Sequence, residues 1–135
     1  MRSENSTVFI GLNATLLWTN PNPSNKFNAQ RVKLNESFDN FDYICVEYKR
    51  EASSSMPIIH TFIAIDENEI FQDSLSGAMT MLFRDDQRAH KVFKLTYSSK
   101  LEIAFFNGFY ADGSPTDMCI PLRVFGVKGK IQGIK

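Results

Sequence analysis

Apolar and polar side chains alternate along most of the chain, which is the pattern of β-strands that bury one face. Within residues 91–97, for example, Phe93 and Leu95 fall on one face, and Lys94 and Thr96 fall on the other. The same period predicts nine strands, at residues 7–12, 15–18, 30–34, 41–49, 56–65, 77–84, 91–97, 100–106 and 118–127. The most hydrophobic of these, residues 56–65, is expected to be buried on both faces.

Turn-forming residues separate the predicted strands. Residues 97–100 predict a tight hairpin, residues 84–88 a polar turn, and residues 107–117 a long loop rich in Asn, Gly and Asp. The only helical candidate is residues 66–71, which would make one or two turns. Pro121 has no N–H to donate to a sheet, so it belongs at an edge, a strand start or a bulge.

These elements predict an all-β fold, an antiparallel β-sandwich of the jelly-roll kind with about nine strands. An immunoglobulin-like sandwich would give nearly the same pattern, so the strand order stays open. The 135 residues suit one domain, and no linker divides them. We therefore expect a single domain over residues 1–135, with residues 1–6 and 129–135 as flexible ends or docking segments.

Charge and hydropathy narrow the function classes. The 15 basic residues balance the 15 acidic residues, so no net positive field favours binding to nucleic acid. The basic residues near the end, Lys128, Lys130 and Lys135, suit a solvated tail. No run approaches the ~20 apolar residues of a membrane helix, and no signal peptide is recognisable. We expect a protein made in the cytoplasm, without membrane insertion.

The sequence offers no grouping of residues typical of catalysis. Cys45 and Cys119 lie in apolar runs without further ligands at zinc spacing, so buried free thiols are favoured, although a disulfide between them stays open. His60 suits a core histidine and His90 a solvated one. No nucleophile elbow, phosphate loop or metal motif is present. We predict a protein that is not an enzyme and uses no cofactor or metal; a small hydrolase is the distant alternative.

Two aromatic features are candidates for ligand contact. Trp18 ends a predicted strand, where its ring suits either a lid over the sandwich core or a platform for a sugar; we favour the lid. Phe109 and Tyr110 lie beside Asp112 in the predicted loop, a combination that carbohydrate sites use. The same pair suits a loop anchor or a subunit contact, which we rank first.

Two segments of the sequence together resemble a known family. The first segment opens with Leu-Leu-Trp-Thr-Asn-Pro-Asn-Pro at residues 16–23 and continues with residues 27–34 and 41–48. The second segment is the ending at residues 119–128. Together they are similar to C-terminal domains of phage tail fibres, head fibres and related appendages. The resemblance implies a β-sandwich module, commonly trimeric, exposed on a virion and without catalytic residues. Such domains usually follow a shaft, and only about fourteen residues precede the first matching strand here. We therefore expect direct docking on capsid or tail, or a stalk supplied by another chain.

The first functional hypothesis is thus a phage virion structural protein, a head-fibre, decoration or tail-fibre module that contributes to host attachment. Its expected partners are copies of itself as a homotrimer, other virion proteins and a host surface glycan. The expected subunit contacts are Phe105, Phe109 and Phe125, because excess aromatic surface marks interfaces. The alternative is a carbohydrate-binding module that uses Trp18 and the loop at residues 107–117.

Overall fold

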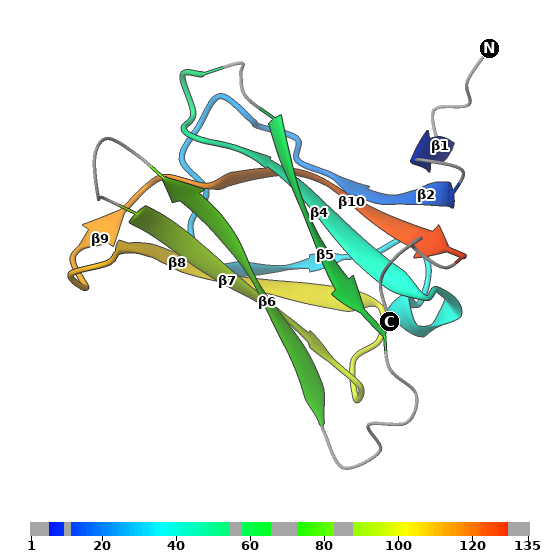
Figure 1. Cartoon of the computed structure of the whole chain (residues 1–135). Coiled ribbons are helices and arrows are strands. Elements are labelled where there is room, and N and C mark those ends of the chain that lie inside the picture. Colours follow the sequence, from blue (N-terminus) through cyan, green and yellow to red (C-terminus); the bar gives the residue numbers. More distant parts are fainter. Residues whose placement is uncertain (1–5, 10–11, 55–57, 66–72, 83–87, 130–135) are drawn as a thin grey trace.

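The computed structural model of the chain describes residues 6–9, 12–54, 58–65, 73–82 and 88–129, and the side chains from residue 13 on. It is an open sandwich of two antiparallel sheets, drawn as two layers in Figure 1. The strands are β1 (Ser6–Phe9), β2 (Leu12–Thr19), β3 (Gln30–Lys33), β4 (Tyr43–Lys49), β5 (Ile58–Ala64), β6 (Ser74–Leu82), β7 (Arg88–Thr96), β8 (Glu102–Tyr110), β9 (Pro115–Thr116) and β10 (Ile120–Lys128). A single 3₁₀ turn, η1 (Phe38–Asn40), is the only helical element among the described residues. The predicted all-β antiparallel sandwich is therefore confirmed.

Long-range pairing sets the order of the strands. One sheet has the order β1-β2-β10-β4-β5, and the other has β3-β8-β7-β6 with β9 paired to β8. The chain crosses between the sheets from β2 to β3, from β3 to β4, from β5 to β6 and from β8–β9 to β10, and crossings of this kind are typical of jelly rolls. By contrast, β4 and β5 form an antiparallel pair within one sheet, and β6, β7 and β8 form a meander.

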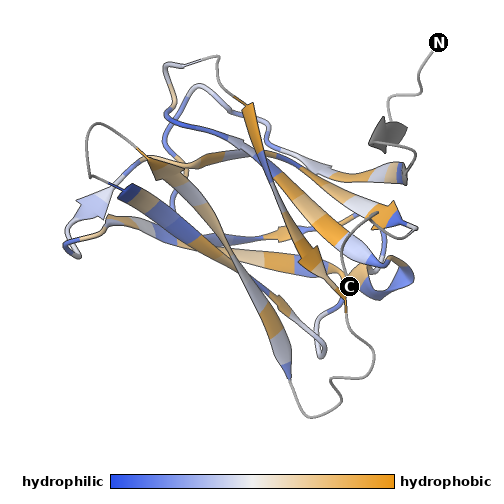
Figure 2. Cartoon of the chain, in the orientation of Figure 1, coloured by the Kyte–Doolittle hydropathy of each residue, from blue (hydrophilic) through white to orange (hydrophobic). Residues whose placement is uncertain are grey.

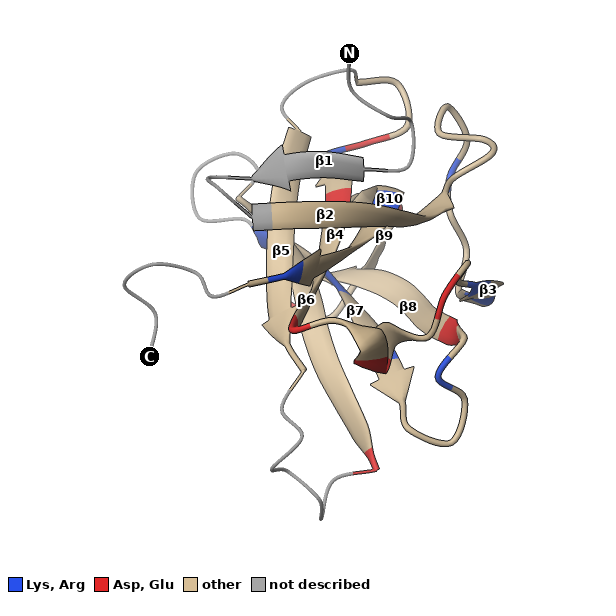
Figure 3. Cartoon of the chain, turned by 90° about the vertical axis from the view of Figure 1, so that its right-hand side faces the viewer, with Lys and Arg blue, Asp and Glu red and all other residues tan. Residues whose placement is uncertain are grey.

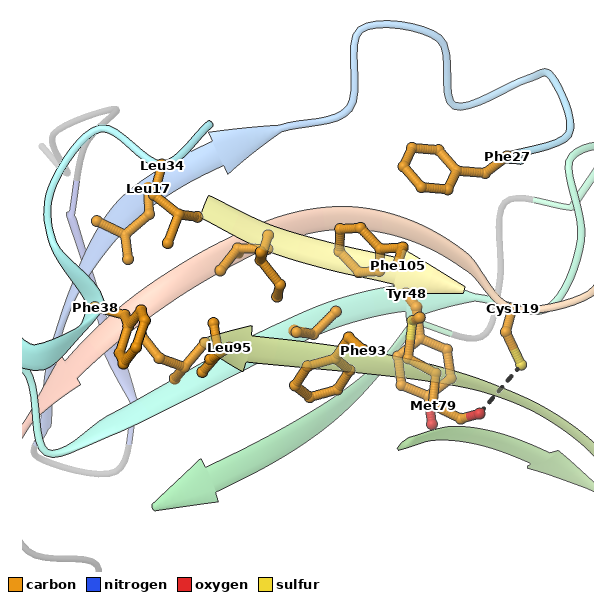
Figure 4. Packing of buried hydrophobic residues seen from close by; sticks show 14 of the residues in the cluster. Leu17, Phe27, Leu34, Phe38, Tyr48, Met79, Phe93, Leu95, Phe105 and Cys119 are labelled. Carbon is orange, nitrogen blue, oxygen red and sulfur yellow. Dashed lines mark hydrogen bonds between the residues drawn. The ribbon is translucent and has the colours of Figure 1, made fainter. Parts of the chain in front are cut away.

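The core lies between the two sheets. Figure 4 shows Phe38, Leu95 and Leu34 toward one end of it, and Phe105, Phe27 and Cys119 toward the other. The alternation predicted for β7 is confirmed, because Phe93 and Leu95 are fully buried. Colouring by hydropathy shows apolar residues concentrated along β4, β5 and β10 (Figure 2). At about 25 cal/mol per Å² of buried apolar surface, this core is the main source of stability.

A bulge in β2 places two consecutive residues in the core. Val124 of β10 pairs with Trp18, but the next residue, Phe125, pairs with Leu16, so Leu17 has no partner of its own. Leu17 is fully buried, and Trp18 packs against the same core cluster. A regular strand would have turned one of the two outward, and the bulge removes that constraint.

Pro121 lies in β10 at a second bulge. Its register partner is Tyr48, whereas Arg123 pairs with Glu47, so one extra residue stands on β10. The predicted bulge is confirmed, but the alternative of an edge strand is wrong, because β10 lies between β2 and β4. The sheet tolerates this proline because the ladder is already interrupted there.

Two further predictions need correction. Strand β5 is an edge strand whose outer face is exposed, with Ile58 and Phe62 43% and 39% accessible, so it is not buried on both faces. That environment belongs to β4, where six of seven residues are buried. Strand β8 continues to Tyr110, so the first four residues of the predicted loop 107–117 are strand, and only Ala111–Ser114 form the turn before β9. Composition marks an apolar strand without telling which neighbours pair with it.

The other predicted turns agree with the structure where it describes them. The hairpin at residues 97–100 joins β7 to β8 and includes a hydrogen bond from the Ser99 N–H to the Thr96 carbonyl at 2.9 Å. The turn at Gly113 has φ +91°, which a glycine adopts freely. The predicted helix at residues 66–71 and residues 84–87 lie outside the described residues, as do residues 1–5 and 130–135 of the predicted flexible ends.

Candidate functional site

Trp18 covers one end of the core. Its ring packs against Phe27 and Phe105, with centroids at 5.8 and 5.7 Å, and those two rings lie 5.3 Å apart in a T-shaped arrangement. The indole lines neither of the cavities described below. Its packing on the core is that of the lid that the sequence analysis favoured, and contact of Trp18 with a sugar stays a prediction.

The three other candidate ligand residues lie near one another at the β9 end of the sandwich. Phe109 and Tyr110 are the last residues of β8, and they line two neighbouring cavities. Asp112 is exposed and lines neither; its carboxylate accepts hydrogen bonds from the N–H and Oγ of Ser114, at 2.9 and 2.6 Å. These bonds lower the pKa of Asp112 below its usual value. Asp112 therefore shapes the turn.

Two of the three expected subunit contacts are not on the surface. Phe105 is 2% exposed and belongs to the main core. Phe125, also 2% exposed, belongs to a second cluster with Ala14, Cys45 and Val127, and the Arg123 guanidinium lies 5.2 Å from the centre of its ring. A subunit contact needs accessible surface, so within one chain neither residue offers it. Only Phe109, 40% exposed, has the accessibility that this role needs.

The outer face of the sheet formed by β3, β8, β7 and β6 carries an apolar patch that sequence analysis missed in part. Phe105 faces the core, so the next residue, Phe106, faces outward. Phe106 and Asn107 together stand opposite the single residue Val92, which makes a bulge in β8. Because of this bulge, Phe109 faces outward as Phe106 does. Val92 and its register partner Ala78 lie on this face as well. We call Ala78, Val92, Phe106 and Phe109 the outer patch; Phe106 is 44% exposed. His90, predicted to be solvated in a turn, is a half-buried strand residue opposite Phe109.

Two cavities flank β9. The first, which we call the β9 cavity, has a volume of about 240 Å³, and the second, the Tyr110 cavity, about 550 Å³. Both are lined by Pro115, Thr116 and Asp117, so β9 and the residue after it form a shared wall. The β9 cavity adds Phe27, Asn28, Lys91, Asn107, Gly108 and Phe109, and the Tyr110 cavity adds Lys26, Glu51, Ala52, Ser53, Tyr110 and Met118.

Lys91 is the unusual residue of the β9 cavity. It is 1% exposed, although lysine is almost never fully buried without a partner. Its Nζ donates a hydrogen bond of 2.7 Å to the Phe27 carbonyl and lies 5.5 Å from the centre of the Phe27 ring. Burial lowers the pKa of Lys91, and the charges of Cys119 and Asp117 oppose that shift. The sequence carried a signal for it, since Lys91 stands two residues before the inward-facing Phe93.

An ion-pair network occupies the outer face of the other sheet, on strands β10, β4 and β5. The Glu47 carboxylate, 6% exposed, accepts hydrogen bonds from Nε and Nη2 of Arg123, the latter at 2.9 Å, and lies 3.1 Å from Nε2 of His60. These bonds raise the pKa of Arg123. His60 is thus on the outer face and not in the core, contrary to the prediction. Elsewhere the charges are dispersed: in the view of Figure 3, acidic and basic residues are scattered over strands and loops.

The cysteines are free and buried, as predicted, and they lie in different clusters. Cys45 belongs to the second cluster, with Ala14, Phe125 and Val127. Cys119 faces the main core, where its thiol donates a long hydrogen bond of 3.6 Å to the Met79 carbonyl (Figure 4). Burial raises the pKa of Cys45 to about 12, with a contribution from Glu47, and that of Cys119 to about 11, against the opposing effect of Lys91.

Both thiols are therefore expected to be inert in the folded protein. Ellman's reagent at pH 8 should release almost no thionitrobenzoate from native protein and two equivalents in denaturant, because the thiolate is the reactive form. Between pH 9 and the raised pKa values, the two thiols stay protonated in the folded state but lose their protons in the unfolded state, where their pKa is the usual 9.0. Stability should consequently fall as the pH rises from about 9 toward 12. Rapid native labelling at pH 8 would contradict this assignment.

Within the described ranges of the chain, no three His, Cys, Asp or Glu residues stand close enough together to hold a metal ion. In the same part of the chain, no helix has the length and hydropathy to cross a membrane.

Comparison of the sequence with protein-family models and with curated proteins gave no match.

Proposed function

We propose that this chain is a non-catalytic structural module of a phage virion, a head-fibre, decoration or tail-fibre domain that assembles with copies of itself. The observation that carries the proposal is the outer patch. Its two phenylalanines, Phe106 and Phe109, are each at least 40% exposed and lie on one side of the sheet. An exposed apolar patch on a folded domain marks an interaction surface, and a homotrimer would cover three such patches around one axis.

The segments that carry the resemblance to phage appendage domains support the proposal, because all of them except residues 27–34, which contain β3 of the other sheet, lie side by side in one sheet. Strands β2, β10 and β4 are neighbours in one sheet. Asn20 of the opening segment donates from its side chain to the Pro121 carbonyl and from its backbone to the Leu122 carbonyl, each at 2.8 Å. A Cβ at Gly126 would stand 2.4 Å from the Phe41 ring, so the glycine of the ending accommodates that ring. The resemblance therefore follows residues that determine the fold.

The solution mass tests this proposal. Light scattering of the purified chain should give a mass near three times the 15.4 kDa of one chain. Phe106→Ser should reduce the mass to one chain without changing the far-ultraviolet spectrum, since Phe106 is not in the core. Leu101→Ser removes another exposed apolar residue, 47% accessible in the β7–β8 turn, and should leave the mass unchanged.

Two results would contradict the proposal. One is a mass of a single chain at every concentration, and the other is an oligomer that Phe106→Ser leaves intact. The virion assignment has its own test: mass spectrometry of particles purified from a culture that produces the protein should find the chain at a fixed ratio to the capsid protein. Its absence from those particles would exclude the assignment.

A second function, carbohydrate binding, is favoured by a different observation. Phe109 and Tyr110 line two adjoining cavities that also contain Lys91 and Asp117. A pocket with an aromatic wall and a few convergent polar groups is the usual form of a small-ligand site. The two functions are compatible, because a virion module can bind a glycan of its host.

A further inference from the structure

Lys91 has more hydrogen-bonding capacity than the described residues use. An ammonium group has three N–H donors, and only the bond to the Phe27 carbonyl is formed. The side chain is 1% exposed, so bulk water does not fully solvate the remaining N–H donors of the ammonium group. Burying a charge without sufficient partners is costly, which makes the β9 cavity a place where added acceptors would be bound favourably.

The other walls of the cavity supply complementary groups. Asp117 is exposed at the wall shared by the two cavities and forms no ion pair with Lys91 among the described residues. The Oδ1 of Asn107 accepts a hydrogen bond of 3.0 Å from the Ala29 N–H, which leaves its Nδ2 to donate. Phe109, 40% exposed, adds an apolar ring face. One cation and one anion on the walls match a neutral ligand better than a charged one.

We propose that the β9 cavity binds one ring of a neutral carbohydrate. Adjacent hydroxyl groups accept from Lys91 and Asn107 and donate to Asp117, while the C–H face of the ring packs on Phe109. The volume of about 240 Å³ is just below the ~300–1,000 Å³ of pockets for drug-sized ligands, which suits a single ring. A second ring continues past Thr116 into the Tyr110 cavity. This inference rests on the second proposed function, and it shares Phe109 with the outer patch proposed for self-assembly.

Titration followed by ¹H–¹⁵N correlation spectra tests the site. The probes are the methyl glycosides of glucose, galactose, mannose, N-acetylglucosamine and rhamnose at millimolar concentration, with sodium glucuronate as the acidic comparison. At least one neutral glycoside should shift the amide signals of Asn107, Thr116 and Asp117. Lys91→Met and Asp117→Asn should each weaken that binding by about tenfold or more, as expected for the loss of a charged hydrogen bond.

Matched controls separate binding from folding. Lys94→Met changes a lysine on the outer face of the same strand, and Asp112→Asn changes a carboxylate that lines neither cavity; both should bind as the original chain does. If Lys91→Met fails to fold, the exposed Asp117→Asn decides. The inference is overturned if no neutral glycoside shifts these signals, if Lys91→Met and Lys94→Met bind equally, or if glucuronate binds more tightly. None of these results changes the mass expected for the assembly.

Discussion

Phe105→Ala is expected to lower the free energy of unfolding by about 3–5 kcal/mol, the usual cost of removing a buried phenylalanine ring. The ring is 2% exposed and lies against Trp18, Phe27 and Phe93, with centroids at 5.7, 5.3 and 6.4 Å. Alanine would leave a cavity among three other rings, two of them held by strands β2 and β7, so the site cannot collapse fully. Urea or guanidinium unfolding followed by tryptophan fluorescence measures the change, because Trp18 reports on this cluster directly.

The neighbouring residue provides the control for that experiment. Phe106 follows Phe105 on β8 but points outward and is 44% exposed, so at protein concentrations low enough to keep the chain monomeric Phe106→Ala should change the stability by no more than about 0.5 kcal/mol. Both variants remove the same atoms from adjacent positions, and only the side of the sheet differs. Equal losses for the two variants, or a loss below about 1 kcal/mol for Phe105→Ala, would contradict the assignment of Phe105 to the core.

Local alternation predicted the strands well because it depends only on which side chains share a face. It placed Ile103 and Phe105 inward on β8, as the structure has them. It failed where the register changes. Asn107 and Gly108 have the composition of a turn, but Asn107 stands in the bulge, and Gly108 lies where a Cβ would be 2.9 Å from the Thr116 carbonyl. A close approach between β8 and β9 requires that glycine, and nothing local distinguishes it from a turn glycine.

Strand order was beyond sequence reasoning for a related reason. The alternation in β5 is no less apolar than that in β4, yet β5 is at the edge and β4 lies between two neighbours. The difference comes from β10, which inserts between β2 and β4 although about seventy residues separate it from β4. Pairing over such a separation depends on how the complete set of strands packs, and no window of the sequence contains that information.

The candidate site could have been predicted in part. Extending the alternation of β7 by one step puts Lys91 on the same face as Phe93, where a lysine is exceptional. That observation alone identifies a buried cation. It does not identify Asp117 or Asn107 as neighbours, since Asp117 follows β9 and Asn107 lies in the bulge of β8. The position of Phe109 beside them depends on the same bulge.

Arg123→Met is expected to lower the free energy of unfolding by about 2–4 kcal/mol. Removing one partner of a fully buried pair costs about 3–5 kcal/mol, and the 44% exposure of Arg123 reduces that figure. The cost arises because the Glu47 carboxylate, 6% exposed, would retain only the bond to His60 among the contacts described above. Guanidinium unfolding of Arg123→Met beside the original chain measures it.

Two comparisons make this prediction decisive. Lys100 is also 44% exposed and bonds a carboxylate, that of Asp39, at 2.7 Å, but Asp39 is 30% exposed and well solvated, so Lys100→Met should destabilise the fold much less than Arg123→Met does. The two cations thus differ chiefly in the burial of their partners. Adding Glu47→Gln to Arg123→Met should recover much of the loss, because an amide carries no charge to desolvate. If Arg123→Met costs no more than Lys100→Met, or if the second substitution adds to the loss, the buried charge of Glu47 is not what makes Arg123 necessary.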